Sequence, residues 1–452
     1  MTLLKALLPA LMLVPVMLFP NPAAVADTGL CPEIPAGSDN PDISGNPGCS
    51  SGHECLKAGL ACREAGIYPR ALAFLEAACN LNDPDGCGFA GVAYETGEGT
   101  PRNPIKTVQL YRKACSLDSV PGCFSLGMVY WNGSGVRQNY DEAVRNFKNL
   151  CRKDHPGACY MLGTASLEGK GVPQSPEEAR RLYGQSCNMK HAPACHGLGL
   201  LFMNGTGGPK SPEEAVKLFS MSCQGGSPDG CNSYAIALRD GTGTAQNVAD
   251  AQQLFIKGCN EGFMNSCTNL GWLYEGSKNY RDAADLYDRA CGKNDAEGCF
   301  RLAMLHDEGK GFARDPRKAV VLFRRSCDLD NGRACNHLAI AYRDGTGTMQ
   351  SFRESSRLFE KSCNLGYSYG CTSLGYSYFN GRGVSKNLKT ANELYDRACN
   401  MDNGTACYNL GVNYLEGAGV AKDHGTAVKF LDRACRLKDD AACQKLREVQ
   451  PQ

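Results

Sequence analysis

Cysteine is the residue whose type and spacing carry the clearest chemical signal in this 452-residue sequence. Twenty-two of its 26 cysteines form pairs eight positions apart, and successive pairs recur every 36 residues, or once after 32. The pairs are Cys79 with Cys87, Cys115 with Cys123, Cys151 with Cys159, Cys187 with Cys195, Cys223 with Cys231, Cys259 with Cys267, Cys291 with Cys299, Cys327 with Cys335, Cys363 with Cys371, Cys399 with Cys407, and Cys435 with Cys443. Such pairs can form disulfides or supply thiolates to zinc. Zinc ligand pairs usually have two to four residues between them, whereas these have seven, so the spacing favours disulfides.

The four remaining cysteines are Cys31, Cys49, Cys55 and Cys62. Cys49 and Cys55 approximate one of the regular pairs but are two residues closer together. Cys31 could reach Cys62 from the N-terminal segment. Three connectivities are possible for four cysteines, and the sequence does not choose among them.

The N-terminal residues predict that the chain is exported to an oxidising compartment, where these thiols can form disulfides. Lys5 precedes an apolar run over residues 6–19, and the small residues Ala24 and Ala26 form a cleavage signal. This order of parts predicts a signal peptide over residues 1–26, since the apolar run is too short to span a bilayer. An uncleaved membrane anchor fits less well because the apolar run is short. A lipid on Cys31 also fits less well, because a lipid-attachment site has a small residue directly before its cysteine and Leu30 is not small. We therefore expect a secreted or periplasmic protein with no membrane span after cleavage.

The balance of charge argues against two classes of partner. Formal net charge is +1 at pH 7. Nucleic acids and anionic membranes usually select a basic patch, so neither is expected as a partner.

The elements that must position the cysteines are pairs of helices. Leu126, Gly127 and Tyr130 follow Cys123 at the i+3, i+4 and i+7 spacing of an amphipathic helix. Two glycines, as in Gly133-Ser-Gly135, then end this first helix. A second helix follows, and in the next unit it begins with Ser175-Pro176-Glu177-Glu178, which predicts a serine cap and a capping box.

The small and aromatic residues of the repeat predict how the hairpins pack. A glycine or alanine recurs at the Gly127 position, which indicates close approach of the second helix. Aromatic residues recur at the Tyr130 and Phe147 positions and are predicted to fill the core. The sequence thus predicts an all-α protein, a right-handed α/α solenoid of about eleven hairpins. It would extend over residues 51–448, with an extended N-terminal cap over residues 27–50 and a tail over residues 449–452.

This repeat resembles the Sel-1-like family, 36-residue relatives of tetratricopeptide repeats (TPR). The family pattern is matched by Leu126-Gly127-Met-Val-Tyr130, Gly133-Ser-Gly135 and Ala143 to Phe147. The two cysteines per repeat are similar to the bacterial cysteine-rich Hcp-type proteins. The resemblance implies the solenoid fold and disulfides at the junctions between hairpins. It implies two functions, because members of the cysteine-rich group are often labelled β-lactamase or penicillin-binding protein, whereas Sel-1-like proteins in general are adaptors.

Motifs for β-lactam chemistry are incomplete. No serine has a lysine three residues later, and Lys-Thr-Gly does not occur, although Ser38-Asp39-Asn40 does. His191 and His196 are interpreted as a solvated pair rather than a metal site. No catalytic residue, metal or cofactor is predicted.

A binding surface is the favoured interpretation. In TPR-like arrays the first helix of each hairpin lines a concave face, and its side chains there are expected to point away from the stacked helices. The predicted contact residues are Phe124, Trp131, Tyr160, Asn232, Arg239, Trp272, Asn336, Arg343, Tyr376, Phe379 and Tyr408. Aromatic residues with Asn and Arg are typical of recognition surfaces. The sequence therefore predicts an exported scaffold for a protein, a peptide or a cell-wall glycopeptide, with β-lactam hydrolysis as the alternative.

Overall fold

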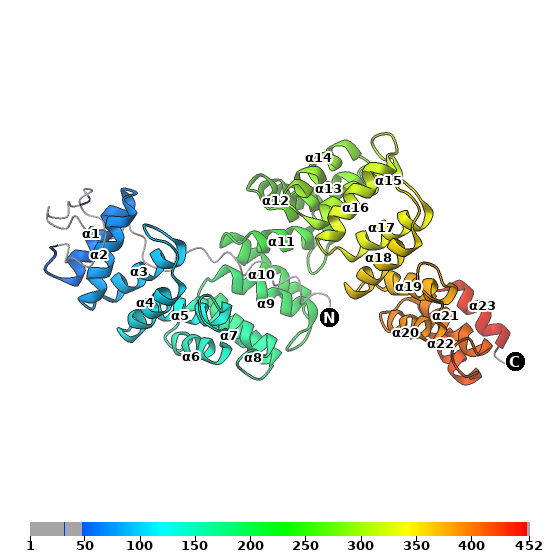
Figure 1. The fold of residues 1–452 in the computed structure, drawn as a ribbon, viewed down its shortest axis with the longest axis horizontal. Helices are drawn as coiled ribbons and strands as arrows, with labels where there is room; N and C mark the ends of the chain where they lie inside the picture. The colour runs from blue at the N-terminus through cyan, green and yellow to red at the C-terminus, as the bar shows by residue number, and fades with distance from the viewer. Residues whose placement is uncertain (1–30, 32–47, 450–452) are drawn as a thin grey trace. The chain divides into compact units, whose positions relative to one another are not determined.

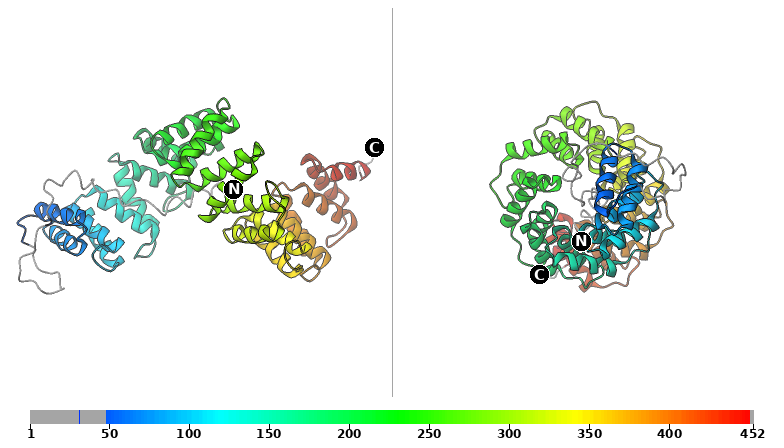
Figure 2. Two further views of the ribbon diagram at one scale, coloured as in Figure 1. Left: turned by 90° about the horizontal axis from the view of Figure 1, so that it is seen from above. Right: turned by 90° about the vertical axis from the view of Figure 1, so that its left-hand side faces the viewer.

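The computed structural model describes residue 31 and residues 48–449. The predicted signal peptide lies outside the described residues, as do most of the predicted cap and residues 450–452. In the described part every regular element is a helix, and the chain divides into two compact units between Asn247 and Val248. Within each unit consecutive helices lie side by side as hairpins (Figures 1 and 2), so each unit is an α/α solenoid, as predicted.

The first unit contains α1 to α11: α1 (Gly52–Glu64), α2 (Tyr68–Asn80), α3 (Pro84–Thr96), α4 (Pro104–Ser116), α5 (Val120–Asn132), α6 (Tyr140–Cys151), α7 (Pro156–Glu168), α8 (Pro176–Asn188), α9 (Ala192–Asn204), α10 (Pro212–Gln224) and α11 (Pro228–Asp240). The second contains α12 to α23: α12 (Val248–Asn260), α13 (Met264–Gly276), α14 (Tyr280–Gly292), α15 (Ala296–Glu308), α16 (Pro316–Asp328), α17 (Gly332–Asp344), α18 (Phe352–Asn364), α19 (Ser368–Asn380), α20 (Leu388–Cys399), α21 (Gly404–Glu416), α22 (His424–Arg436) and α23 (Asp440–Val449).

Glycine and serine set the ends of the helices as predicted, with one exception. Gly133 ends α5 in the left-handed region at φ 72°, and the hydroxyl of Ser175 accepts the N–H of Glu178 at the start of α8. The predicted capping box is wrong, because the Glu178 carboxylate binds Arg181 instead. The Ser175 N–H is already satisfied, since it donates to the Ser166 carbonyl at 2.8 Å.

Close packing inside each hairpin depends on the small residue of the first helix. A Cβ added at Gly127 would lie 2.6 Å from Cε1 of Phe147, the aromatic residue of the second helix. Phe147 is fully buried, and its counterparts Tyr111, Tyr183, Phe219, Phe255, Tyr287, Phe323, Phe359 and Tyr395 are buried as well. The predicted aromatic core is confirmed at the Phe147 position, where the glycine makes room for the ring. At the Tyr130 position the prediction holds only for Tyr94, because Tyr130 and its other counterparts Tyr274, Tyr342, Tyr378 and Tyr414 are half-buried.

Disulfides join each hairpin to the next. All eleven predicted pairs are bonded, with Cα–Cα distances of 4.3–4.8 Å. Each bond connects the end of one second helix to the start of the following first helix. The bonds join Cys79 with Cys87, Cys115 with Cys123, Cys151 with Cys159, Cys187 with Cys195, Cys223 with Cys231, Cys259 with Cys267, Cys291 with Cys299, Cys327 with Cys335, Cys363 with Cys371, Cys399 with Cys407, and Cys435 with Cys443.

The N-terminal cysteines follow a different pattern. The connectivity that the sequence leaves open is Cys31–Cys62 and Cys49–Cys55. No cysteine in the described part of the chain is free.

Candidate binding site

The structure divides the predicted contact residues into three groups by exposure. Phe124, Trp131 and Asn336 are buried, and Trp131 is only 5% exposed. Tyr160, Asn232, Arg239, Arg343, Phe379 and Tyr408 are half-buried. Trp272 and Tyr376 are exposed, at 39% and 46%.

The expectation that all these side chains point away from the stacked helices is wrong for the buried group. The Trp131 ring lies 5.0 Å from that of Tyr140, and the Nζ of Lys170 in the next repeat's loop is 5.6 Å from it. The Phe124 ring lies 5.0 Å from that of His155, at the start of the following hairpin. Phe124 therefore faces the next repeat, whereas Trp131 is enclosed between the second helix of its own hairpin and the loop of the next repeat.

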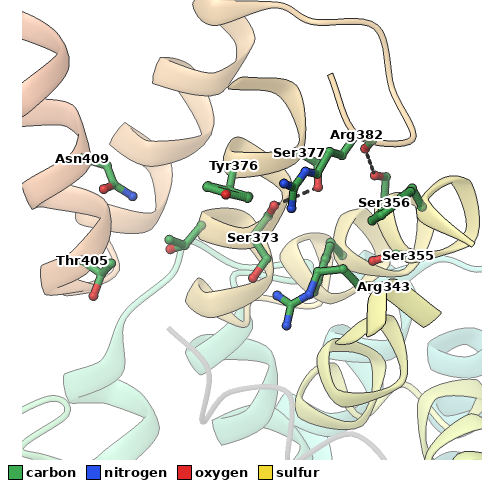
Figure 3. A pocket seen from close by; sticks show the side chains of 12 residues that line it. Arg343, Ser355, Ser356, Ser373, Tyr376, Ser377, Arg382, Thr405 and Asn409 are labelled. Carbon is green, nitrogen blue, oxygen red and sulfur yellow. Dashed lines mark hydrogen bonds between the residues drawn. The ribbon is translucent and has the colours of Figure 1, made fainter. Parts of the chain in front are cut away.

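Two of the predicted residues, Arg343 and Tyr376, come together at a pocket in the second unit (Figure 3). Its volume is about 190 Å³. It lies among α17, α18, α19, the loop after α19, and α21, and so draws on three consecutive repeats. The lining residues are Arg343, Phe352, Ser355, Ser356, Phe359, Thr372, Ser373, Tyr376, Ser377, Arg382, Thr405 and Asn409. The other predicted contact residues do not line this pocket.

Two arginines give the pocket its charge. Figure 3 shows Arg343 and Arg382 on either side of Ser373. Arg343 donates from Nε and Nη2 to the two oxygens of Asp344, at 2.8 and 2.9 Å, and this ion pair raises the pKa of Arg343 above its usual value. Three of its five N–H groups are left for other partners.

Arg382 has a different environment. Its Cζ lies 5.6 Å from the centre of the Tyr376 ring and 6.0 Å from that of Phe352. Within the described residues no carboxylate lies within ion-pairing distance of it. The twelve lining residues, all in the described part, include two arginines and no aspartate or glutamate, and behind the lining the hydroxyl of Thr405 donates to the Asp439 carboxylate at 3.2 Å.

Three hydroxyl groups of the pocket donate to main-chain carbonyls. Ser356 donates to Arg382 at 2.8 Å, Ser377 to Ser373 at 3.0 Å, and Thr372 to Ser368 at 3.0 Å. The first of these bonds holds the loop after α19 against α18.

Ser355 has no such bond. It is 2% exposed, and its Oγ has no hydrogen-bond partner in the described part of the chain. A buried hydroxyl left unsatisfied costs about 1–3 kcal/mol. The corresponding position of every other hairpin is alanine, or threonine at Thr107, whose hydroxyl donates to the Asn103 carbonyl. Ser355 is therefore a departure from the repeat that packing alone does not explain.

Guanidinium, hydroxyl, amide and aromatic groups meet at this site. Guanidinium and hydroxyl groups donate hydrogen bonds to anions, and aromatic rings contact apolar carbon. The arrangement can bind a group that is anionic on one side and apolar on the other.

Sequence reasoning did not identify Ser355, Arg382 and Phe352. Ser355 could have been found by aligning the repeats with one another, because it replaces the alanine that most other hairpins have at this position. Arg382 stands between Gly381 and Gly383, a loop position that the prediction treated only as the end of a helix.

The histidines do not form a site with several metal ligands. Within residue 31 and residues 48–449 no three His, Cys, Asp or Glu side chains cluster as metal ligands. The predicted solvated pair is wrong, because both rings are half-buried and have separate neighbours. His196 shares a 2.9 Å hydrogen bond with Ser233, and His191 lies 5.4 Å from the Tyr160 ring. Burial, and to a lesser extent the charge of His155, lowers the pKa of His191 to about 4.

The repeated hairpins and the disulfides that join them define a class of protein, the disulfide-linked helical-hairpin repeat proteins. Within that class the chain belongs to the Sel1 repeat family. The family model, Sel1 repeat, matches residues 84–119, 120–155, 156–191, 192–227, 228–263, 265–295, 296–331, 332–367, 368–403 and 404–439. The predicted family is thus confirmed. No curated protein shows significant similarity to the sequence.

Solved structures that the chain matches include proteins of three bacteria. A protective antigen of uropathogenic Escherichia coli, described as displaying an SLR fold, is 21% identical over 88% of this chain and 87% of its own, with a TM-score of 0.53. A Sel1 repeat protein of Oxalobacter formigenes is 21% identical over 68% of this chain and 90% of its own, with a TM-score of 0.49. Cysteine rich protein B of Helicobacter pylori is 31% identical over 29% of this chain and 96% of its own, with a TM-score of 0.26.

Among the described helices, none has both the length and the apolar character that crossing a bilayer requires. Disulfides at every junction are typical of proteins in oxidising, non-cytoplasmic environments.

Proposed function

We propose that this protein is an exported binding scaffold that captures a protein or peptide partner at the pocket of Arg343, Tyr376 and Arg382. The observation that carries the proposal is the exposure of Tyr376 beside two arginines that face one pocket. Tyrosine and arginine are enriched among residues that dominate binding energy. Trp272, the other exposed aromatic residue of the predicted surface, is proposed as a further contact.

The repeat architecture supports this role. In stacked hairpins each repeat contacts its neighbours, and the first helices present a continuous surface for extended partners. Junction disulfides oppose local unfolding, which suits a scaffold that works outside the cell. The leader pattern of residues 1–26 and the paired cysteines together support export.

A pull-down tests the proposal. The mature chain from Asp27, immobilised, is incubated with periplasm or culture fluid, in parallel with a Tyr376→Ala/Arg382→Ala double variant. Arg357→Ala serves as the control, because Arg357 lies on α18 in an exposed ion pair with Glu354 and does not line the pocket. We expect a partner that is captured by the wild type and the control and lost by the double variant. Capture of the same proteins by all three would contradict the proposed site.

A further inference from the structure

We propose that the first unit carries a separate docking surface, a hollow between α8 and α9 that accepts an aromatic side chain of a partner protein beside a carboxylate of the same partner. This Gly184 hollow is lined by five residues of α8 and by Leu198 and Phe202 of α9, helices that lie side by side (Figure 1). Its lining shares no residue with the pocket of Arg343 and Tyr376, so the inference does not rest on the proposed function.

Gly184 is a glycine inside a helix that close packing does not explain. Glycine is unfavourable there relative to alanine. At Gly127 the glycine makes room for a ring, but a Cβ added at Gly184 would meet only Leu198, at 3.9 Å. Every other second helix has a side chain at the corresponding position, three residues before its cysteine: Glu76, Arg112, Lys148, Ser220, Ile256, Asp288, Arg324, Glu360, Asp396 and Asp432.

In other repeats this side chain covers an aromatic residue of the following first helix. Arg112 donates from Nη2 to the Tyr130 hydroxyl at 2.9 Å, and Glu76 accepts the hydroxyl of Tyr94 at 2.8 Å. At the hollow both partners differ, because the glycine has no side chain and Phe202 replaces the tyrosine. The half-buried ring of Phe202 therefore has no cover at this place and needs no hydroxyl partner.

Arg180 is held over the same ring. Its Cζ lies 3.6 Å from the centre of the Phe202 ring, and its Nη1 donates to the Pro209 carbonyl at 3.2 Å. Valine is the commonest residue at this position of the other second helices, as at the buried Val144. Gly208 leaves space for the guanidinium, because an added Cβ would lie 2.4 Å from Nη1. Several departures from the repeat thus meet at this one place.

The charge of Arg180 is available to a partner. Within the described residues no carboxylate lies within ion-pairing distance of it, since Glu178 binds Arg181 at 2.7 and 2.8 Å and Glu177 accepts from the Ser175 hydroxyl at 3.1 Å. A guanidinium stacked on a ring keeps its in-plane N–H groups for a carboxylate, which it can bind at two points. The hollow therefore favours an acidic partner.

The rest of the hollow favours an aromatic side chain. Leu198 and Phe202 form its apolar floor, and a ring placed there can also contact the planar face of the Arg180 guanidinium. The volume of about 530 Å³ equals that of roughly eighteen liquid water molecules, which admits an aromatic side chain and an acidic neighbour.

The open form of the hollow favours a protein as the partner. Only two helices line it, so it cannot enclose most of a small ligand as ligand pockets do. A protein needs to insert only its side chains and keeps its main chain outside. The occupant is therefore an acidic surface segment with an exposed aromatic residue.

Isothermal titration calorimetry with three unlabelled peptides tests the inference on the full mature chain. The probes are acetyl-Gly-Glu-Phe-Glu-Gly-amide and two relatives, one with alanine for the phenylalanine and one with glutamine for both glutamates. Each peptide ends in an amide, so a terminal carboxylate cannot be the group that binds. We expect the first probe to bind and each relative to bind at least about tenfold more weakly.

Variants separate a binding role from a structural one. Gly184→Gln fills the hollow with a long, uncharged side chain that favours the helix, so the melting temperature should stay equal or rise while binding is lost. The control Ser220→Gln makes a similar change at the equivalent position of α10, outside the lining, and should bind normally. Arg180→Met should remove the preference for glutamate over glutamine.

Four outcomes overturn the inference. They are no binding of the first probe, equal binding of its alanine relative, full binding by Gly184→Gln, and an unchanged glutamate preference in Arg180→Met. Size-exclusion chromatography tests the other occupant. A wild-type dimer that Gly184→Gln converts to a monomer would show that a second copy of the chain fills the hollow, and the proposed acidic partner would be wrong.

Discussion

The hydroxyl of Ser356 donates a 2.8 Å hydrogen bond to the main-chain carbonyl of Arg382, twenty-six residues later. The next hairpin has the equivalent hydrogen bond at the same sequence separation, since the amide of Asn392 donates to the Ala418 carbonyl at 2.8 Å. A side chain of the second helix thus holds the loop that follows the next first helix.

Removal of this bond should loosen the loop that presents Arg382. We expect Ser356→Ala to lower the free energy of unfolding by about 1 kcal/mol, because the Arg382 carbonyl loses its donor. Urea unfolding followed by circular dichroism measures the change. Ser116→Ala is the control, since its hydroxyl bond to the Lys113 carbonyl is exposed. Equal stability of Ser356→Ala and the wild type would show that the bond does not hold the loop.

The two tryptophans should respond in opposite ways to truncation. Trp131→Ala should cost about 3–5 kcal/mol of stability, because it leaves a cavity in the core. Trp272→Ala, at an exposed position, should change stability by no more than about 0.5 kcal/mol. Melting temperatures of both variants check the assignment. Early melting by Trp272→Ala, or normal melting by Trp131→Ala, would contradict it.

The disulfide beside the pocket should contribute measurably to stability. Replacement of Cys363 and Cys371 by serine opens a nine-residue loop, which on the chain-entropy model costs about 2.5 kcal/mol. Denaturant unfolding of the double variant measures this. In the wild type, thiol titration in denaturant should find no free cysteine, and peptide mapping should recover each pair. Stoichiometric binding of zinc, together with thiols that react before reduction, would contradict the assignment of these cysteines to disulfides.

Export should leave a defined new N-terminus. If residues 1–26 are cleaved, Edman sequencing of protein recovered from the oxidising compartment should begin at Asp27. An intact Met1 would mean that the leader is retained. A lipid found on Cys31 would both place the protein on a membrane and break the Cys31–Cys62 disulfide.

Hydrolysis of β-lactams should stay at background. Turnover of nitrocefin by the pure mature chain should not follow the protein through purification, because no serine of the sequence has the lysine partner of the known motif. A rate that co-purifies with the protein and is abolished by one substitution would favour the enzyme.

The repeat could be predicted from the sequence because its signals are local. The signals are the spacing of the cysteines, the small residue at the Gly127 position and the serine caps. Each acts within one hairpin or across one junction, so periodicity alone identifies them. The burial of Trp131 could not be predicted, because it depends on how the Lys170 loop of the next repeat covers it. The pocket depends on departures from the repeat, and Ser355 gains meaning only when Arg382 and Tyr376 are placed beside it.

The cysteine connectivity has a consequence for how the chain matures. From Cys79 onward each cysteine is bonded to its immediate successor or predecessor along the sequence. Oxidation in the order of emergence from a translocation pore would therefore produce the native bonds. Only the first four are nested, with Cys49–Cys55 enclosed by Cys31–Cys62. There the same rule would first join Cys31 to Cys49, so formation of the native pairs would require disulfide exchange at the N-terminal end.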